Sequence, residues 1–221
     1  MEGTQSPDYS VYLVADRTCC RGRDIFGVVE EAVRGGASLV QLREKETGAR
    51  EFVHIARQMK RLLYSLDTPL IINDRVDVAL ACGADGVHVG QEDMHPKDVR
   101  LLTGPELLVG LTVHTPELAR EAQDLPVDYL GAGPVFGTAS KEDPKPRLEP
   151  QGLARIREQT SLPLVGIGSI TADNAAEVIR AGADGAAVIS AICSAESPFR
   201  AASELRDAVN AARASWPRVA R

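Results

Sequence analysis

The sequence predicts an α/β fold, a single-domain (β/α)8 or TIM barrel in which parallel strands alternate with helices. Short apolar runs rich in β-branched residues recur along the 221 residues, and longer segments of helical pattern separate them. Such runs are typical of parallel strands that are buried on both faces. One glycine connector also recurs between helix and strand, which indicates a βα unit that is repeated until the sheet closes.

Each apolar run is an expected strand: Val11–Ala15, Leu39–Leu42, Leu70–Ile72, Gly86–Val89, Leu107–Leu111, Tyr129–Ala132, Leu164–Ile167 and Ala186–Ile189. Helices are expected at segments such as Ile25–Arg34, Ala49–Tyr64, Pro116–Gln123, Leu153–Gln159, Ala172–Ala181 and Pro198–Ala214. The domain should span residues 1–221, with a core from about residue 9 to residue 214 and short frayed ends.

Three connectors carry the repetition: Gly35–Ser38, Cys82–Asp85 and Ala181–Asp184. In each, a glycine is expected to take the left-handed cap of a helix, and a small residue and a polar one then lead into the next strand. A doubly wound open sheet is the alternative fold. That fold would place a G-x-G-x-x-G turn after the first strand, where residues 16–20 read DRTCC.

Charge and hydropathy exclude some classes of function. A net charge of −6 argues against general affinity for nucleic acid, because a phosphate backbone requires a basic surface. The first ten residues are polar and carry acids, unlike a signal or transit peptide. No stretch reaches the roughly 18 apolar residues of a membrane span. We therefore expect a cytoplasmic protein with small-molecule partners, no nucleic acid and no membrane, and the sequence is compatible with a homo-oligomer.

The four cysteines predict no metal or disulfide framework. Cys19, Cys20, Cys82 and Cys193 lack C-x-x-C spacing, and two of them are adjacent. We expect free thiols in a reducing compartment.

Polar residues follow the apolar runs at the strand ends, where barrels place their active sites. After the second strand, alternation puts Gln41, Arg43 and Lys45 on one side, which suggests an anion site at the mouth of the barrel. The alternative is a solvated loop with an Arg–Glu surface pair, which stabilises little.

Two carboxylates end neighbouring strands, Asp74 after the third and Asp93 after the fourth. Magnesium is usually held by one or two carboxylates together with substrate phosphates and water, so this pair is a candidate metal site. Asp74 could instead cap the next helix, and Asp93 could be a turn residue before Pro96.

The fifth strand is followed by Thr112–Pro116. Thr115 is expected to cap a helix whose first residue is Pro116. His114 has two interpretations, a proton-transfer group or a packed histidine.

The sixth strand is followed by a long loop, residues 133–147, which resembles a lid or binding loop in its length. Its hydroxyls and Lys141 could wrap a phosphate, and the alternative is a simple polar loop. Gly168 and Ser169 after the seventh strand and Ile189 and Ser190 after the eighth predict a phosphate cup of backbone N–H groups.

Five motifs in order at these strand ends resemble the thiamine phosphate synthase family. They are Gln-Leu-Arg-Glu-Lys at 41–45, Ile-Asn-Asp-Arg at 72–75, Gly-Gln-Glu-Asp at 90–93, Gly-Pro-Val-Phe-x-Thr-x-Ser-Lys at 133–141 and Gly-Ile-Gly at 166–168. The similarity runs from about Tyr12 to Leu205.

The resemblance implies a transferase that joins 4-amino-2-methyl-5-(diphosphooxymethyl)pyrimidine to a thiazole phosphate, carboxylated or plain, with Mg²⁺. It implies that the pyrimidine diphosphate is contacted by Gln41, Leu42, Arg43, Glu44, Lys45, Asn73, Thr112 and Lys141. The thiazole phosphate would be contacted by Thr138, Ala139, Ser140, Ser169, Ile189 and Ser190. Asp74 and Asp93 would hold the magnesium, and Arg43, Lys45 and Lys141 would be the catalytic cations.

The sequence departs from the family pattern at Thr112, where serine is common, and at Ser169, where the family usually has glycine. A positive φ at Ser169 would cost stability or shift the phosphate cup. Two other functions share this fold: a thiazole tautomerase that would use a histidine near His114, and a non-catalytic barrel that binds phosphorylated ligands. The paired aspartates and the Gln-x-Arg-x-Lys run favour the synthase.

Overall fold

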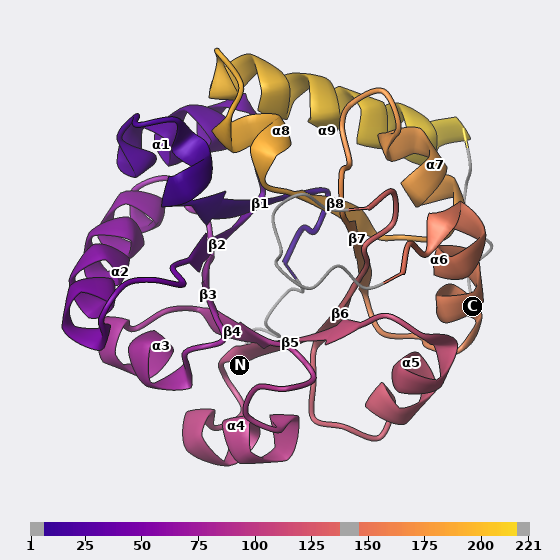
Figure 1. Cartoon of the computed structure of the whole chain (residues 1–221), viewed down its shortest axis with the longest axis horizontal. Helices are drawn as coiled ribbons and strands as arrows, with labels where there is room; N and C mark the ends of the chain where they lie inside the picture. The colour runs from indigo at the N-terminus through magenta and orange to yellow at the C-terminus, as the bar shows by residue number, and fades with distance from the viewer. Residues whose placement is uncertain (1–6, 138–145, 216–221) are drawn as a thin grey trace.

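The computed structural model describes residues 7–137 and 146–215, which form a closed barrel of eight parallel strands in sequence order (Figure 1). The strands are β1 (Val11–Asp16), β2 (Leu39–Arg43), β3 (Leu70–Asn73), β4 (Gly86–Val89), β5 (Leu108–Val113), β6 (Tyr129–Ala132), β7 (Leu164–Ile167) and β8 (Gly185–Val188). Closure comes from the pairing of β1 with β8, in which Tyr12 lies opposite Ala187. The predicted barrel is confirmed, and the open-sheet alternative is wrong.

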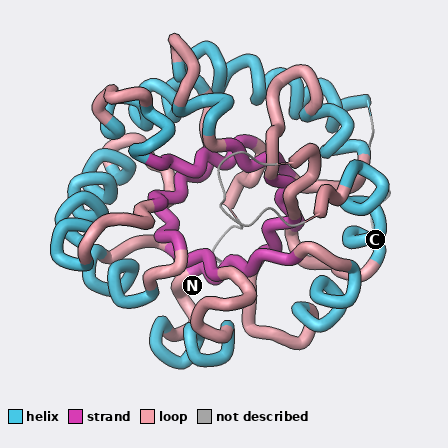
Figure 2. The backbone as a smooth tube through the Cα atoms, in the orientation of Figure 1, coloured by secondary structure: helices cyan, strands magenta, loops and turns pink. Residues whose placement is uncertain are grey.

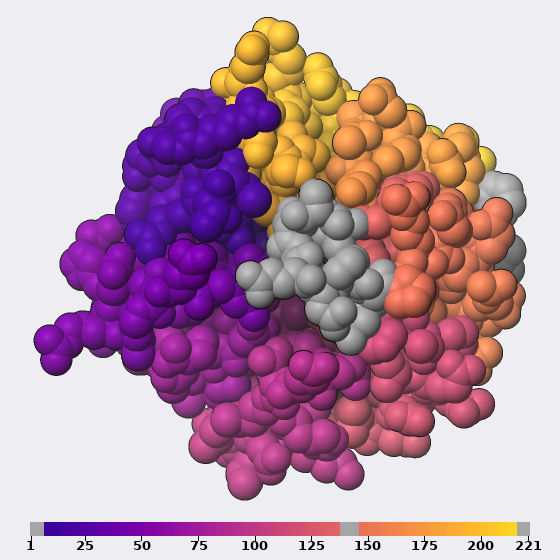
Figure 3. All heavy atoms as spheres, in the orientation of Figure 1, coloured from indigo at the N-terminus to yellow at the C-terminus, as the bar shows by residue number. Residues whose placement is uncertain are grey.

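Helices surround the strands as an outer ring (Figure 2). They are the 3-10 helix η1 (Arg17–Cys20) and the α-helices α1 (Ile25–Gly35), α2 (Ala49–Tyr64), α3 (Val76–Cys82), α4 (Pro96–Thr103), α5 (Pro116–Ala122), α6 (Glu149–Glu158), α7 (Ala175–Arg180), α8 (Ser190–Cys193) and α9 (Pro198–Ser215). In the space-filling view the indigo first unit lies beside the yellow last helices, as closure requires (Figure 3). Among the described residues, no helix combines the length and the apolar character that a membrane crossing needs.

Most helix bounds agree with the sequence pattern, and two helices begin at other residues than expected. Helix α7 begins at Ala175 rather than Ala172, because the Asn174 side chain accepts from the backbone N–H of Thr171 and closes a turn there. Helix α6 begins at Glu149, earlier than the expected Leu153. The four cysteines are free thiols, as predicted.

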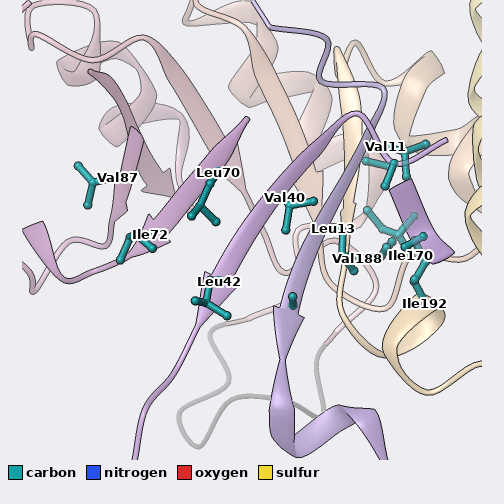
Figure 4. Packing of buried hydrophobic residues seen from close by; sticks show 14 of the residues in the cluster. Val11, Leu13, Val40, Leu42, Leu70, Ile72, Val87, Ile170, Val188 and Ile192 are labelled. Atoms are coloured by element: carbon teal, nitrogen blue, oxygen red, sulfur yellow. The ribbon is translucent and has the colours of Figure 1, made fainter. Parts of the chain in front are cut away.

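Side-chain alternation along the strands produces two apolar layers. Outward residues such as Leu13, Val40 and Ile72 are fully buried against the helices (Figure 4). Inward residues, among them Tyr12 and Tyr129, form a separate cluster inside the barrel. The predicted inward side of β2 therefore carries Leu39, Gln41 and Arg43, and its outward side carries Val40 and Leu42.

The glycine connectors build the N-terminal rim of the barrel as the sequence predicts. Gly36, Gly83 and Gly182 have φ of 117°, 68° and 100°. In each connector the N–H of the following alanine bonds back to a carbonyl five residues earlier, as Ala37 does to Ala32 at 2.9 Å. This pattern is that of the Schellman motif, which requires a left-handed residue that glycine supplies without strain.

A polar residue then leads into every even-numbered strand and binds the preceding odd-numbered one. Asp85 accepts from Leu70 N–H, Asp128 from Val109 N–H, and Asp184 from Leu164 N–H, at 2.7 to 2.8 Å. Ser38 plays the same part for the N–H of Val11 at 3.2 Å. The three aspartates also pair with cations of the outer helices: Lys60, Arg100 and Arg157. The chain thus repeats its structure in pairs of βα units.

Candidate active site

The C-terminal ends of the strands carry the side chains that the sequence assigned to substrate binding. Gln41 and Arg43 lie on β2, Asn73 ends β3, and Thr112 lies near the end of β5. Because the register places Gln41 opposite Ile71 and Asn73 opposite His88, these residues belong to neighbouring inward rows. Arg43 and Asp16 are paired in the same register at the ends of β2 and β1.

Arg43 forms an ion pair with Asp16, and both side chains are largely buried, at 15% and 6% exposed. Asp16 also accepts hydrogen bonds from the Thr18 backbone N–H at 3.0 Å and hydroxyl at 2.6 Å. The guanidinium is therefore held in place at the strand end rather than free in solvent. The alternative of an Arg–Glu surface pair is wrong for Arg43, since Glu44 pairs with Arg17 at 2.8 Å instead.

Lys45, Asp74 and Asp93 form a second charged group at the ends of β2, β3 and β4. Lys45 Nζ lies 2.5 Å from Asp74 Oδ2. Partial desolvation raises the pKa of the Asp93 carboxyl, and the adjacent Asp74 carboxylate raises it further. The two carboxylates that the sequence placed on neighbouring strands are thus close enough to repel each other.

The backbone at Asp74 is strained in a way that capping does not explain. Asp74 has φ of +60°, a left-handed conformation that costs a non-glycine residue about 1–2 kcal/mol. Its N–H donates to the His88 carbonyl at 2.8 Å and so extends the β3–β4 pairing. Helix α3 begins after Arg75 without a side-chain cap, so the helix-cap alternative for Asp74 is wrong. Strain of this kind gathers at functional sites, where surrounding structure maintains it.

Asp93 is a turn residue, as the alternative interpretation held, because its Oδ2 accepts from Gly90 N–H at 2.7 Å. This bond also fixes the carboxylate beside Asp74.

The expected cap of α5 is confirmed, with Thr115 accepting from Leu118 N–H and Pro116 in the first turn. His114 is half-buried beside this cap. Within the described residues, no cluster of three or more metal-ligating side chains occurs.

Two residues of the 41–45 segment have side chains that contact other parts of the fold. The Leu42 side chain is fully buried in the layer between strands and helices, so only its backbone can reach a ligand. The Glu44 side chain is bonded to Arg17 and to Thr47, which donates to it at 2.7 Å. Through these contacts, both residues hold the segment in place without offering a side chain to the ligand.

The ends of β7 and β8 form the other side of the site. Gly168 has φ of 112°, and a Cβ there would lie 2.7 Å from Pro134 Cα, so glycine is required. Ser169 follows with φ of +49° and is exposed, so it has the positive φ that costs a serine stability. Ile189 precedes α8 and Ser190 is its exposed first residue. The first N–H groups of a helix have no intrahelical partner and can bind an anion.

The loop after β6 is anchored next to this cup. Val135 N–H donates to the Ile167 carbonyl at 2.8 Å, and Phe136 N–H donates to the Gly168 carbonyl at 3.2 Å. The stem of the loop thus starts beside Ser169. Four residues that the sequence predicts as ligand contacts lie outside the described residues: Thr138, Ala139, Ser140 and Lys141.

Sequence reasoning missed a set of buried polar residues inside the barrel. Gln41 Nε2 donates to the Tyr12 hydroxyl at 2.7 Å, and that hydroxyl lies 2.8 Å from the Tyr129 hydroxyl. The Tyr129 hydroxyl lies 3.0 Å from His88 Nδ1, and His88 Nε2 lies 2.8 Å from Thr112 Oγ1. A polar residue within an apolar run, as His88 is within Gly86–Val89, was the available signal.

Comparison with known proteins identifies the family. The family model described as thiamine monophosphate synthase matches residues 11–192. The chain belongs to the thiamine monophosphate synthase family. It is a transferase of thiamine biosynthesis.

Individual relatives agree with this assignment. The thiamine-phosphate synthase of Solidesulfovibrio magneticus is 56% identical over 90% of this chain and 94% of its own length. That of Albidiferax ferrireducens is 49% identical over 91% and 92%. Among solved structures, the thiamine phosphate pyrophosphorylase from Pyrococcus furiosus superposes with a TM-score of 0.85 at 39% identity, covering 93% of this chain and 98% of its own.

More distant structures share the fold alone. Orotidine 5'-phosphate decarboxylase from Pyrococcus horikoshii superposes with a TM-score of 0.67 at 15% identity, over 90% of this chain and 99% of that one.

Proposed function

We propose that the chain joins 4-amino-2-methyl-5-(diphosphooxymethyl)pyrimidine to a thiazole phosphate, carboxylated or plain, with the aid of Mg²⁺. The observation that carries this proposal is the charged group of Lys45, Asp74 and Asp93 beside the buried Arg43–Asp16 pair. A site with cations and two mutually repelling carboxylates suits a ligand that brings both a divalent cation and a diphosphate.

The residues present fit magnesium. Two carboxylates with water and substrate phosphates are its usual ligands, and a third protein ligand is not required. Desolvation and, after it, the adjacent Asp74 carboxylate raise the pKa of Asp93, and a divalent cation would stabilise the charged form of both carboxyls. When bound, the metal would neutralise charge on the diphosphate.

The side chains have separate tasks in the proposed reaction. The C–O bond between the pyrimidine methylene and the diphosphate breaks, and the bonding electrons leave with the diphosphate. Arg43, Lys45 and Lys141 would stabilise that charge as it develops, which is electrostatic catalysis of a leaving group. The electron-rich pyrimidine ring stabilises the methylene cation, and the thiazole nitrogen then captures it. Close positioning of the two substrates replaces any covalent nucleophile.

The binding residues would divide between the two substrates. Gln41, Asn73 and Thr112 would contact the pyrimidine side, together with the backbone of residues 42–45. The backbone of Ser169, Ile189 and Ser190 would contact the thiazole phosphate, since all three lie at the ends of β7 and β8. Thr138, Ala139 and Ser140 would complete that phosphate site from the loop.

A direct assay tests the proposal. Purified protein is incubated with both substrates and Mg²⁺, and thiamine phosphate is detected by mass. We expect product with Mg²⁺ and none after chelation with EDTA, with activity restored by added Mg²⁺. Product formation that persists unchanged under chelation would exclude the metal, and absence of product under all conditions would exclude the proposed reaction.

A further inference from the structure

Five polar side chains cross the interior of the barrel as one hydrogen-bonded network. They are Gln41, Tyr12, Tyr129, His88 and Thr112, joined in that order by contacts of 2.7, 2.8, 3.0 and 2.8 Å. We call them the interior network. Its two ends, Gln41 and Thr112, are residues that the proposed function places against the pyrimidine. The three residues between them have no part in that function as described above.

The surrounding structure makes room for this network. The register sets His88, Gly110 and Tyr129 side by side on β4, β5 and β6. A Cβ on Gly110 would lie 2.2 Å from the Tyr129 ring and 2.3 Å from His88 Nδ1, so the two side chains meet through the space that glycine leaves. Gly131 does the same beside Thr112, with a Cβ position 3.0 Å from the His88 ring. Glycine within a strand lowers strand stability, and the space that the interior network needs accounts for Gly110 and Gly131.

The protons of the network can be assigned in order. Burial raises the pKa of Tyr12 and of Tyr129 far above the usual range, so each phenol keeps its proton and has one to donate. Gln41 donates to the Tyr12 oxygen, so the Tyr12 proton goes to Tyr129. The Tyr129 proton then goes to His88 Nδ1, which leaves the ring proton of His88 on Nε2, facing Thr112.

We propose that Tyr12, Tyr129 and His88 are positioning residues that fix the hydrogen-bonding pattern which Gln41 and Thr112 present to the substrate. This inference rests on the proposed function only in taking those two residues as substrate contacts. With the assigned direction, Thr112 accepts from His88 and keeps its own hydroxyl proton for an acceptor on the ligand. Gln41 keeps its oxygen for a donor. When every proton of the network has an acceptor within it, the direction at one end fixes the direction at the other, because each phenol has a single proton.

The tautomer of His88 tests this direction without any assay of turnover. Long-range ¹H–¹⁵N correlation spectra of the ¹⁵N-labelled chain report which ring nitrogen of each histidine carries the proton. The His88 signals are identified by their loss in His88→Gln. We expect the ring proton on Nε2 and an unprotonated Nδ1. A ring protonated on Nδ1 would overturn the assigned pattern, whether or not the protein makes thiamine phosphate.

Three buried tyrosines provide a matched test of function. Tyr12→Phe and Tyr129→Phe each remove one hydroxyl of the network, whereas Tyr9→Phe removes a hydroxyl outside it. Tyr9 packs on Tyr129 with ring centroids 5.1 Å apart, so it shares the same surroundings. We expect kcat/KM for the pyrimidine substrate to fall by about tenfold or more in the first two variants, the scale of a buried polar partner left unsatisfied. Tyr9→Phe should stay within about twofold of the wild type.

Two further readouts separate positioning from a general loss of stability. The KM for the thiazole phosphate should remain unchanged in both network variants, since that substrate binds at the ends of β7 and β8. His88→Gln keeps one acceptor and one donor and should retain more activity than His88→Leu, which fills the space without polar atoms. Equal losses in Tyr9→Phe and Tyr129→Phe, or equal activity of His88→Leu and His88→Gln, would overturn the proposal. The tautomer remains measurable if His88→Leu fails to fold.

Discussion

The two rims of the barrel use the same residue types in different ways. At the N-terminal rim, Asp85 accepts from Leu70 N–H at 2.7 Å and from Lys60 at 2.6 Å. At the C-terminal rim, Asp74 pairs with Lys45 but faces a second carboxylate, Asp93. An aspartate bound to both a strand N–H and a cation has its charge compensated within the fold. The charge of Asp93 is less well compensated, because desolvation and the Asp74 carboxylate both raise its pKa, and this marks the C-terminal rim as the place for a ligand.

The difference extends to the backbone. In the three glycine connectors of the N-terminal rim the left-handed residues are glycines, as at Gly36 and Gly83, so they carry no strain, whereas the connector before β3 has Asp67 at φ of 50°. At the C-terminal rim, Asp74 and Ser169 take positive φ without being glycine. Conformations of this kind persist when the surrounding structure enforces them, and they gather where function requires a particular arrangement.

The largest effect is expected at the paired aspartates. Asp74→Ala and Asp93→Ala should each abolish magnesium-dependent turnover, because the diphosphate and metal would lose a ligand. Both variants should remain folded at the assay temperature, because Asp74→Ala loses the pair with Lys45 and Asp93→Ala loses the hydrogen bond from Gly90 N–H, each a loss of about 0.5–1.5 kcal/mol. The measurement is product formation across a range of Mg²⁺ concentrations, together with thermal unfolding. Near-normal activity with unchanged Mg²⁺ dependence in either variant would refute the metal assignment.

Arg43 and His114 separate the synthase from the tautomerase. Arg43→Ala should lose nearly all coupling activity, because the departing diphosphate loses its buried cation. His114→Asn should retain most activity, since departure of a leaving group requires cations rather than a proton shuttle. In a tautomerase the order would reverse, because general acid–base catalysis contributes roughly 100- to 10,000-fold. Both variants are measured in the same coupling assay.

At the opposite rim, a substitution should affect stability without affecting chemistry. Asp85→Ala removes the acceptor for Leu70 N–H and the partner of Lys60, and should lower the free energy of unfolding by about 1–2 kcal/mol. Its kcat at a temperature where the chain is folded should equal that of the wild type. Glu30→Ala is the matched control, since its exposed pair with Arg34 contributes about 0.3–0.5 kcal/mol. A fall in kcat for Asp85→Ala would mean that the rims are not independent.

Local patterns predicted the barrel and much of the site, since each depends on a few adjacent residues. Apolar runs gave the strands, and alternation put Gln41 and Arg43 on the inward face. Such patterns do not predict contacts that depend on closure of the barrel. His88 meets Tyr129 across a separation of 41 residues, and Arg43 meets Asp16 across 27. Each requires the register between strands, which no single strand encodes.

The sequence also did not predict the backbone conformation of individual residues. Ser169 fits either sign of φ on sequence grounds, and the value of +49° follows from the path between β7 and the turn at Thr171. The Asn174 side chain donates to the Ser169 carbonyl at 3.1 Å and helps hold that path. The sequence therefore identified the position at issue, and only the structure gives the sign.

The smallest predicted effect comes from relieving this strain. Ser169→Gly should raise the free energy of unfolding by about 0.5–1 kcal/mol, because the left-handed conformation costs a serine roughly 1–2 kcal/mol and glycine's greater freedom in the unfolded chain offsets part of the gain. Ser65→Gly is the control, since Ser65 has φ of −70° and should gain nothing. Chemical denaturation measures both. If Ser169 contacts the thiazole phosphate through its N–H, the KM for that substrate should stay within about twofold of the wild type, because glycine keeps the N–H. A large rise in KM would show instead that the serine hydroxyl binds the phosphate. The strained backbone at this position would then be needed to place that hydroxyl.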